Sequence, residues 1–167
     1  MGPSDIALLC ILFVLLLFSA FFSSAETALT TFNKVRLRML VDDGNKKAIV
    51  LDKVLSNSRK MLSTVLIGNN IVNIAASLTT VLAQHIFDVN IVVSVCVGVL
   101  TLVIIIFGEI IPKTVATLHA ESIALSYAKP IKFFMFILTP VIFVLNLFSS
   151  FLLKIFRVNV NLNSAAI

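Results

Sequence analysis

Charged residues are scarce in this chain. Asp, Glu, Lys and Arg together make up 13% of its 167 residues, about half of their share in an ordinary soluble domain. Hydrophobic residues make up 59%, and the mean hydropathy is +1.10. This composition excludes a soluble globular domain and indicates a single integral membrane domain.

Cysteine and histidine are also scarce. Cys10 and Cys96 lie far apart in apolar runs without a Cys-x-x-Cys spacing, so we interpret both as small buried hydrophobic residues. His85 and His119 flank a membrane span and are expected at the interface. A serine nucleophile in the membrane would need a general base, and neither histidine falls at the depth of the membrane serines. The sequence therefore argues against an enzyme.

Positive charge is concentrated in residues 33–60, between two apolar runs. The positive-inside rule makes this segment a cytoplasmic loop, which gives the formal net charge of +5 a topological role instead of a nucleic-acid partner. Apolar residues recur at helical spacing on either side of Asp43-Gly44-Asn45, so we expect two short amphipathic helices joined by a turn. The basic residues of the loop are Lys34, Arg36, Arg38, Lys46, Lys47, Lys53, Arg59 and Lys60.

Three apolar segments are long enough to cross a membrane. The first runs over residues 6–32, the second over residues 61–83, and the third begins at Ile91. The first five residues carry no Lys or Arg, which favours a retained helix over a cleaved signal peptide. The link at residues 84–90 also lacks Lys and Arg, so it is expected on the side opposite the basic loop. The N-terminus is then outside the cell.

Residues 133–153 are apolar enough to form a further span. Lys and Arg lie on both sides of this segment, and Pro130 and Pro140 interrupt it. Positive charge at both ends favours a kinked helix lying in the cytoplasmic interface, while a fourth crossing is the alternative. The predicted fold is therefore all-α and integral to the membrane, with three transmembrane helices, two short cytosolic helices and a kinked juxtamembrane helix. We expect residues 1–158 to form the membrane domain, and residues 159–167 to begin a linker.

Each of the three spans contains a polar motif. These are S-S-A-E-T-A at 23–28, G-N-N-I-V-N at 68–73 and G-E-I-I-P at 108–112. Ser24 precedes Lys34 by ten positions and Asn70 follows Lys60 by ten, so at about 1.5 Å per residue both lie at one depth. The third motif would lie at the same depth in the membrane if its helix extends inward through Leu118. Each motif by itself also fits simple helix packing.

Of all residues in the three motifs, Glu109 costs the most free energy to place in the bilayer. A carboxylate in or near the bilayer normally has a partner or a function. Pro112 lacks an N–H group, so it leaves the backbone carbonyl of Gly108 without its helical partner. An acid beside a freed carbonyl outlines a cation site, with Pro112 as the helix break. The structural alternative is an ion pair between Glu109 and Lys113.

All of the candidate ligands offer oxygen atoms. Hard cations such as Mg²⁺, Ca²⁺ or Na⁺ prefer oxygen, whereas Zn²⁺ or Cu⁺ would call for His or Cys. A single carboxylate leaves a divalent ion incompletely neutralised, which suits release and therefore transport. Glu26 is a secondary candidate, because on a regular helix it points away from Ser24. The primary candidates are Ser23, Ser24, Asn70, Asn73, Glu109 and the main-chain carbonyls near Gly68 and Gly108.

The three motifs, in this order and with the basic loop between the first two, resemble the transmembrane domain of the CorC and cyclin M family of magnesium transporters. The resemblance covers nearly the whole chain. It implies a homodimer of three-helix protomers in the cell membrane, with a belt-like juxtamembrane helix, exporting Mg²⁺ from the cytoplasm with Na⁺ as the candidate exchange ion. It also implies a cytosolic pair of CBS domains that bind ATP, to which the linker would lead. The residues that match the family's ion-binding motifs most directly are Ser24, Asn70, Gly108 and Glu109. The alternative function is a membrane anchor or scaffold for such a cytosolic domain.

Overall fold

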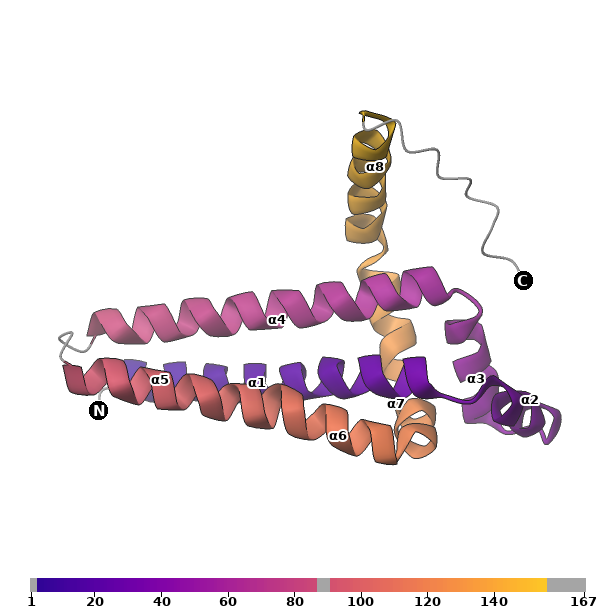
Figure 1. Cartoon of the computed structure of the whole chain (residues 1–167), viewed down its shortest axis with the longest axis horizontal. Helices are drawn as coiled ribbons and strands as arrows, with labels where there is room; N and C mark the ends of the chain where they lie inside the picture. The colour runs from indigo at the N-terminus through magenta and orange to yellow at the C-terminus, as the bar shows by residue number, and fades with distance from the viewer. Residues whose placement is uncertain (1–2, 87–90, 156–167) are drawn as a thin grey trace.

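A computed structural model describes residues 3–86 and 91–155, and these residues are helical apart from short connections. Three long helices lie side by side along the molecule (Figure 1). The elements are α1 (Pro3–Thr31), α2 (Lys34–Asp42), α3 (Lys46–Leu55), α4 (Ser58–Ile86), α5 (Ile91–Ile105), the π-helical turn η1 (Ile106–Ile110), α6 (Ile111–Leu118), α7 (Ala120–Ile137) and α8 (Thr139–Ile155).

The three predicted spans are confirmed as helices long and apolar enough to cross a membrane. Within the described residues these are Ile6–Thr31, Ser58–Thr79 and Thr101–Leu118. The third helix continues from α5 through η1 into α6, so it extends to Leu118 as the convergence of the motifs required. The predicted all-α membrane fold is therefore correct.

The predicted hairpin of two short helices is α2 and α3. The Asn33 side chain accepts hydrogen bonds from the backbone N–H groups of Val35 and Arg36, which caps the start of α2. Asn45 caps α3 in the same way. Between the two helices Gly44 has a φ of 75°, a left-handed conformation that glycine adopts without steric cost. Local sequence signals thus define the whole hairpin.

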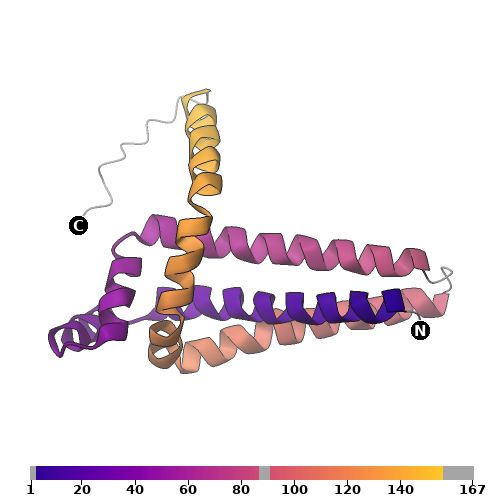
Figure 2. The same cartoon turned by 180° about the vertical axis from the view of Figure 1, so that it is seen from behind.

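Helix α7 crosses the long helices near the end of the bundle that carries α2 and α3, and α8 projects away from the bundle (Figures 1 and 2). The two helices form a bent pair with an angle of 60° between them. Pro130 lies inside α7 without ending it, so the expected interruption there is wrong. The bend falls at Leu138, just before Pro140, which has no N–H group to continue the helical hydrogen bonds.

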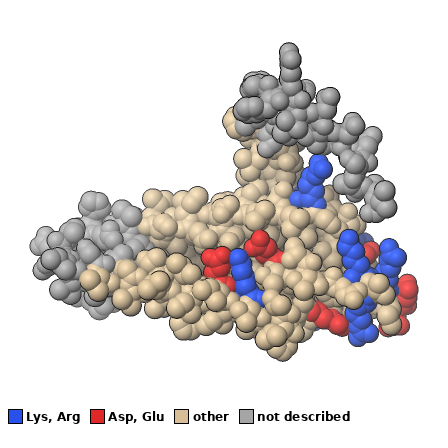
Figure 3. Space-filling view, viewed as in Figure 1, with Lys and Arg blue, Asp and Glu red and all other residues tan. Residues whose placement is uncertain are grey.

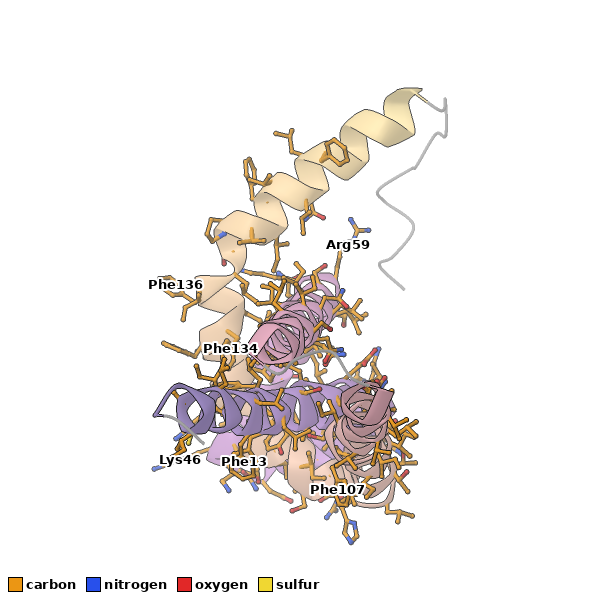
Figure 4. All side chains as sticks on the ribbon, turned by 90° about the vertical axis from the view of Figure 1, so that its left-hand side faces the viewer. Phe13, Lys46, Arg59, Phe107, Phe134 and Phe136 are labelled. Carbon is orange, nitrogen blue, oxygen red and sulfur yellow. The ribbon has the colours of Figure 1, made fainter. Side chains whose placement is uncertain are left out.

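The hydrophobic core lies where the C-terminal half of α1 meets α3, α4 and α7. Alanines occupy many of its fully buried positions, which lets the helix backbones approach closely. Figure 4 looks along the long helices: Phe134 points toward α1 and contacts the rings of Phe21 and Phe22, whereas Phe136 points outward and is 79% exposed. Phe13 and Phe107 also lie on the outer surface. Outward-facing phenylalanines on spanning helices suit contact with lipid tails.

Candidate ion-binding site

A pocket of about 350 Å³ with a mixed apolar and polar lining lies between the three long helices. Its polar lining comes from every one of them, although each helix is mostly apolar. The lining residues are Ser19 from α1, Asn73, Ala76 and Ser77 from α4, Thr101, Ile104 and Ile105 from α5, and Glu109 from η1.

Ser19 connects the three helices at this pocket. Its Oγ lies 3.1 Å from the side-chain Oδ1 of Asn73 and 3.4 Å from the backbone oxygen of Gly108. A hydroxyl carries one proton, so it can donate to only one of these two acceptors at a time. At any time one of these two oxygens is therefore without the Ser19 proton and has a lone pair directed into the site that a cation could use.

Pro112, just after the π-helical turn, explains why the Gly108 carbonyl is available. The N–H of Ile111 donates to the oxygen of Ile106, five residues back, and Pro112 has no N–H to offer to Gly108. The helix nevertheless continues directly into α6, so the predicted break at Pro112 takes the form of one wide turn. A Cβ on Gly108 would lie 3.0 Å from Leu16 Cδ1 and 3.3 Å from Ser19 Oγ. Glycine here permits the close approach of α1.

Glu109 has a cationic partner. Lys113 Nζ lies 2.8 Å from Glu109 Oε1, one helical turn away, and 3.8 Å from Glu26 Oε2 on α1. The ion pair that the sequence offered as the structural alternative is thus formed, and Glu26 joins it. Figure 3 shows charged atoms within the otherwise uncharged body of the bundle, separate from those around α2 and α3.

Two buried oxygens near the pocket have no hydrogen-bond partner. Ser23 is 0% exposed, and neither its Oγ nor Asn69 Oδ1 is bonded. The antiparallel register that sets Ser19 against Asn73 also sets Ser23 at the level of Asn69, one turn further along each helix. Buried polar atoms of this kind normally require a ligand or a water molecule. They extend the oxygen-rich region toward the α2–α3 end of the bundle.

Ser19 and Asn69 were not among the residues predicted for the site. Both carried a signal, because Ser19 precedes Ser23 by four positions and Asn69 precedes Asn73 by four. Residues at this spacing share one face of a helix. Adding one turn to each motif would have identified them.

Three predicted site residues lie apart from the pocket. Ser24 faces α7: its hydroxyl lies 2.6 Å from the Ala20 oxygen and 3.4 Å from the Tyr127 hydroxyl. Asn70 is exposed and does not line the pocket. Gly68 packs directly against the ring of Phe22, where an added Cβ would overlap with the ring. The structure thus brings Asn73, Gly108 and Glu109 together with Ser19, and leaves Ser23 one turn away.

The donor set of the pocket fits a hard cation. Across residues 3–86 and 91–155, no three His, Cys, Asp or Glu side chains cluster in a way that could hold a metal ion. A cation bound in the pocket would depend on hydroxyl, amide and backbone oxygens together with the Glu109 carboxylate. Such a set suits Mg²⁺, Ca²⁺ or Na⁺.

Comparison with known proteins identifies related chains. The family described as the cyclin M transmembrane N-terminal domain matches residues 10–166. A UPF0053 protein of Haemophilus influenzae is 37% identical over 161 residues, covering 96% of this chain and 38% of the relative. The UPF0053 inner membrane protein YfjD of Escherichia coli is 34% identical over 145 residues, covering 86% of this chain and 34% of that protein. A chloroplastic DUF21 domain-containing protein of Arabidopsis thaliana is 40% identical over 146 residues, which are 87% of this chain and 22% of that protein. The chain spans less than two fifths of the length of these curated relatives.

Proposed function

This chain belongs to the family of the cyclin M transmembrane N-terminal domain, and we propose that it carries Mg²⁺ through the membrane, holding the ion in the pocket between α1, α4 and η1. The main support for this proposal is that Glu109, the freed Gly108 carbonyl, Ser19 and Asn73 meet at one pocket of the bundle of long helices. Polar side chains on membrane spans are costly, so they normally have a partner or a function.

Each donor has a distinct role in this proposal. The Glu109 carboxylate supplies the one negative charge that lines the pocket, and Asn73 and Gly108 supply carbonyl oxygens that bind without adding charge. Ser19 turns its proton away from the ion and toward either acceptor. Ser23 is the next donor along the path, because its oxygen is buried and unbonded. A single carboxylate keeps the ion weakly enough bound to leave again.

Magnesium is the proposed cargo because short side chains on rigid helices suit a small ion. Mg²⁺ takes near-octahedral oxygens at about 2.0–2.1 Å, whereas Ca²⁺ needs more ligands at longer distances. Export from the cytoplasm with Na⁺ as the exchange ion follows from the family resemblance. Competition between Mg²⁺ and Ca²⁺ in a binding assay tests the choice, and tighter Ca²⁺ binding would contradict it.

The proposed orientation places the α2–α3 hairpin and the chain end in the cytoplasm and the N-terminus outside. The exposed Lys and Arg side chains of the hairpin support it through the positive-inside rule. The relative from Escherichia coli is named an inner membrane protein. Labelling of a cysteine placed at Asp43 from the outside would contradict this orientation.

A twofold homodimer is proposed as the working unit. Asn70 is exposed on α4, a helix that passes the test for a membrane span. An amide facing lipid is costly, so a second copy that covers this face is favoured. Light scattering in mild detergent should give twice the protomer mass. Regulation by a cytosolic pair of CBS domains that bind ATP belongs to the same proposal.

One observation favours the anchor alternative. Lys113 already partners Glu109, as a purely structural acid would require. Isothermal titration of the purified chain with Mg²⁺ separates the two functions, because an anchor has no reason to bind the ion.

Glu109→Gln tests the site directly. The substitution keeps the size and one oxygen donor but removes the charge, so Mg²⁺ affinity should fall by at least about tenfold. The variant should elute like the parent in size-exclusion chromatography. Glu121→Gln is the matched control, since Glu121 is an exposed acid on α7 outside the pocket. A well-folded Glu109→Gln variant that binds Mg²⁺ like the parent would refute the role of Glu109 as a ligand.

A further inference from the structure

Lys113 is a cation placed next to a proposed cation site. Its ammonium lies between two carboxylates from different helices, at 2.8 Å from Glu109 Oε1 and 3.8 Å from Glu26 Oε2. Its side chain is 37% exposed, compared with 42% for Glu109 and 30% for Glu26. The three groups together carry a formal charge of −1.

The shorter of the two contacts occupies Oε1 of the carboxylate that lines the pocket. Glu109 is a lining residue, whereas Glu26 and Lys113 are not. With Lys113 on Glu109, the empty pocket holds a paired acid, which lowers the cost of keeping that acid inside the bundle. The same ammonium stands in the way of a metal ion that needs the same oxygen.

A divalent ion on Glu109 would repel the ammonium. Mg²⁺ binds carboxylate oxygens at about 2.0–2.1 Å, and two cations on one carboxylate at that spacing repel each other strongly in surroundings of low dielectric. Lys113 therefore needs another acceptor when the ion arrives. Glu26 is that acceptor, because Lys113 Nζ is already within 3.8 Å of it and a side-chain rotation is enough to close the gap.

We propose that Lys113 is a tethered competitor of the transported cation: its ammonium holds Glu109 when the pocket is empty and transfers to Glu26 when the cation binds. This proposal rests on the proposed function, since it concerns the same pocket. Lys113 stays protonated throughout, so only its position changes. Its return to Glu109 favours release of the ion, and the site never exposes two unpaired acids.

Two other roles are compatible with the same contacts and must be separated from this one. In the first, the bridge between Lys113 and Glu109 only stabilises the fold. In the second, Glu26 attracts the cation directly by its charge, independently of Lys113. Both the second role and our proposal expect Glu26→Gln to weaken binding, so that variant alone does not decide between them.

A double-mutant cycle on Mg²⁺ affinity decides. Isothermal titration of the purified chain in mild detergent should show Lys113→Met tightening Mg²⁺ binding by at least about tenfold, since the competitor is gone. Glu26→Gln should weaken binding several-fold, because the displaced ammonium loses its acceptor. In the Lys113→Met background the Glu26→Gln substitution should have no effect beyond about twofold, since no ammonium remains to be relocated.

Each contrary result overturns the proposal. Unchanged or weaker Mg²⁺ binding by Lys113→Met would show that the ammonium does not compete. An undiminished effect of Glu26→Gln in the Lys113→Met background would assign Glu26 to direct attraction of the ion. Lys113→Gln, which keeps a neutral donor for Glu109, replaces Lys113→Met if the latter does not elute as a folded species. Failure of both variants to fold would make the bridge a structural requirement and exclude the competitor role.

The control and the parent chain separate this proposal from the proposed function. Lys132→Met removes an equal charge from an exposed position on α7 and should leave the affinity unchanged. A parent chain that binds no Mg²⁺ would overturn the proposed function and the competitor role together. A parent that binds Mg²⁺, with a Lys113→Met variant of equal affinity, would overturn the competitor role alone.

Discussion

The α2–α3 hairpin and the helix from α5 to α6 each contain one irregular turn, and the two turns are satisfied in different ways. In the hairpin, Asn33 and Asn45 bond to backbone N–H groups two and three residues away, and Gly44 makes the turn itself. In η1, the backbone oxygen of Gly108 is approached by Ser19, a residue 89 positions away. The first turn is a local structure, whereas the second depends on how three helices pack. Substitutions in the two regions should therefore have different consequences.

The largest expected effect is on the packing that brings α1 and α4 together. In Gly68→Ala the new methyl group would overlap with the buried ring of Phe22, so we expect a destabilisation of about 3 kcal/mol from overpacking. Gly98→Ala is the matched control, because no atom lies within 4 Å of its Cβ position and alanine favours the helix. Thermal unfolding in detergent measures both. Equal melting temperatures for the two variants would show that the contact between Phe22 and Gly68 does not limit the packing.

Ser23→Ala has a smaller effect, and its sign is opposite for stability and for binding. The substitution removes a buried hydroxyl that has no partner, so the ion-free protein should gain about 1 to 2 kcal/mol. Loss of one neutral oxygen donor should weaken Mg²⁺ binding by about three- to tenfold.

The neighbouring serine provides the control for this prediction. Ser24→Ala removes a hydroxyl that already bonds to backbone oxygens of α1 and to Tyr127 of α7, so it should lower stability slightly and leave Mg²⁺ affinity nearly unchanged. Titration and melting curves of the two variants decide which hydroxyl belongs to the site. The reverse pattern would assign Ser24 to the ion, as the family resemblance implies.

The smallest effect is expected at the hairpin turn. Gly44 has a φ of 75° with nothing within 4 Å of its Cβ position, so Gly44→Ala should cost about 1 kcal/mol of stability through the backbone alone. Gly44→Asn should cost less, because asparagine tolerates the left-handed region better. Neither variant should change Mg²⁺ affinity, since the turn is remote from the pocket. A loss of binding in either one would mean that the hairpin and the pocket are coupled, and the contrast between the two regions would not hold.

Much of the fold could be predicted from the sequence because its signals act over short distances. The apolar runs that form α1, α4 and the helix from α5 to α6 can be recognised by length and hydropathy alone. The hairpin is specified by its asparagine caps and one glycine. The kink near Pro140 was visible for the same reason, because a missing N–H group acts within one helical turn. Pro130 was misjudged because α7 continues through it, with Ile131 and Met135 buried against the rest of the bundle.

The sequence by itself determined the helical membrane fold, the basic hairpin, and the presence of Glu109 beside a carbonyl that Pro112 leaves free. Only the tertiary structure decided which polar atoms meet. It chose Ser19 and Ser23 over Ser24 for the side of α1 that faces the pocket, set Asn73 against Ser19, and placed Lys113 between Glu109 and Glu26. The physical reason is that a helix fixes the spacing of its own side chains through 1.5 Å and 100° per residue, while the rotation and register of each helix against its neighbours depend on contacts between residues far apart in the chain, such as Gly68 with Phe22.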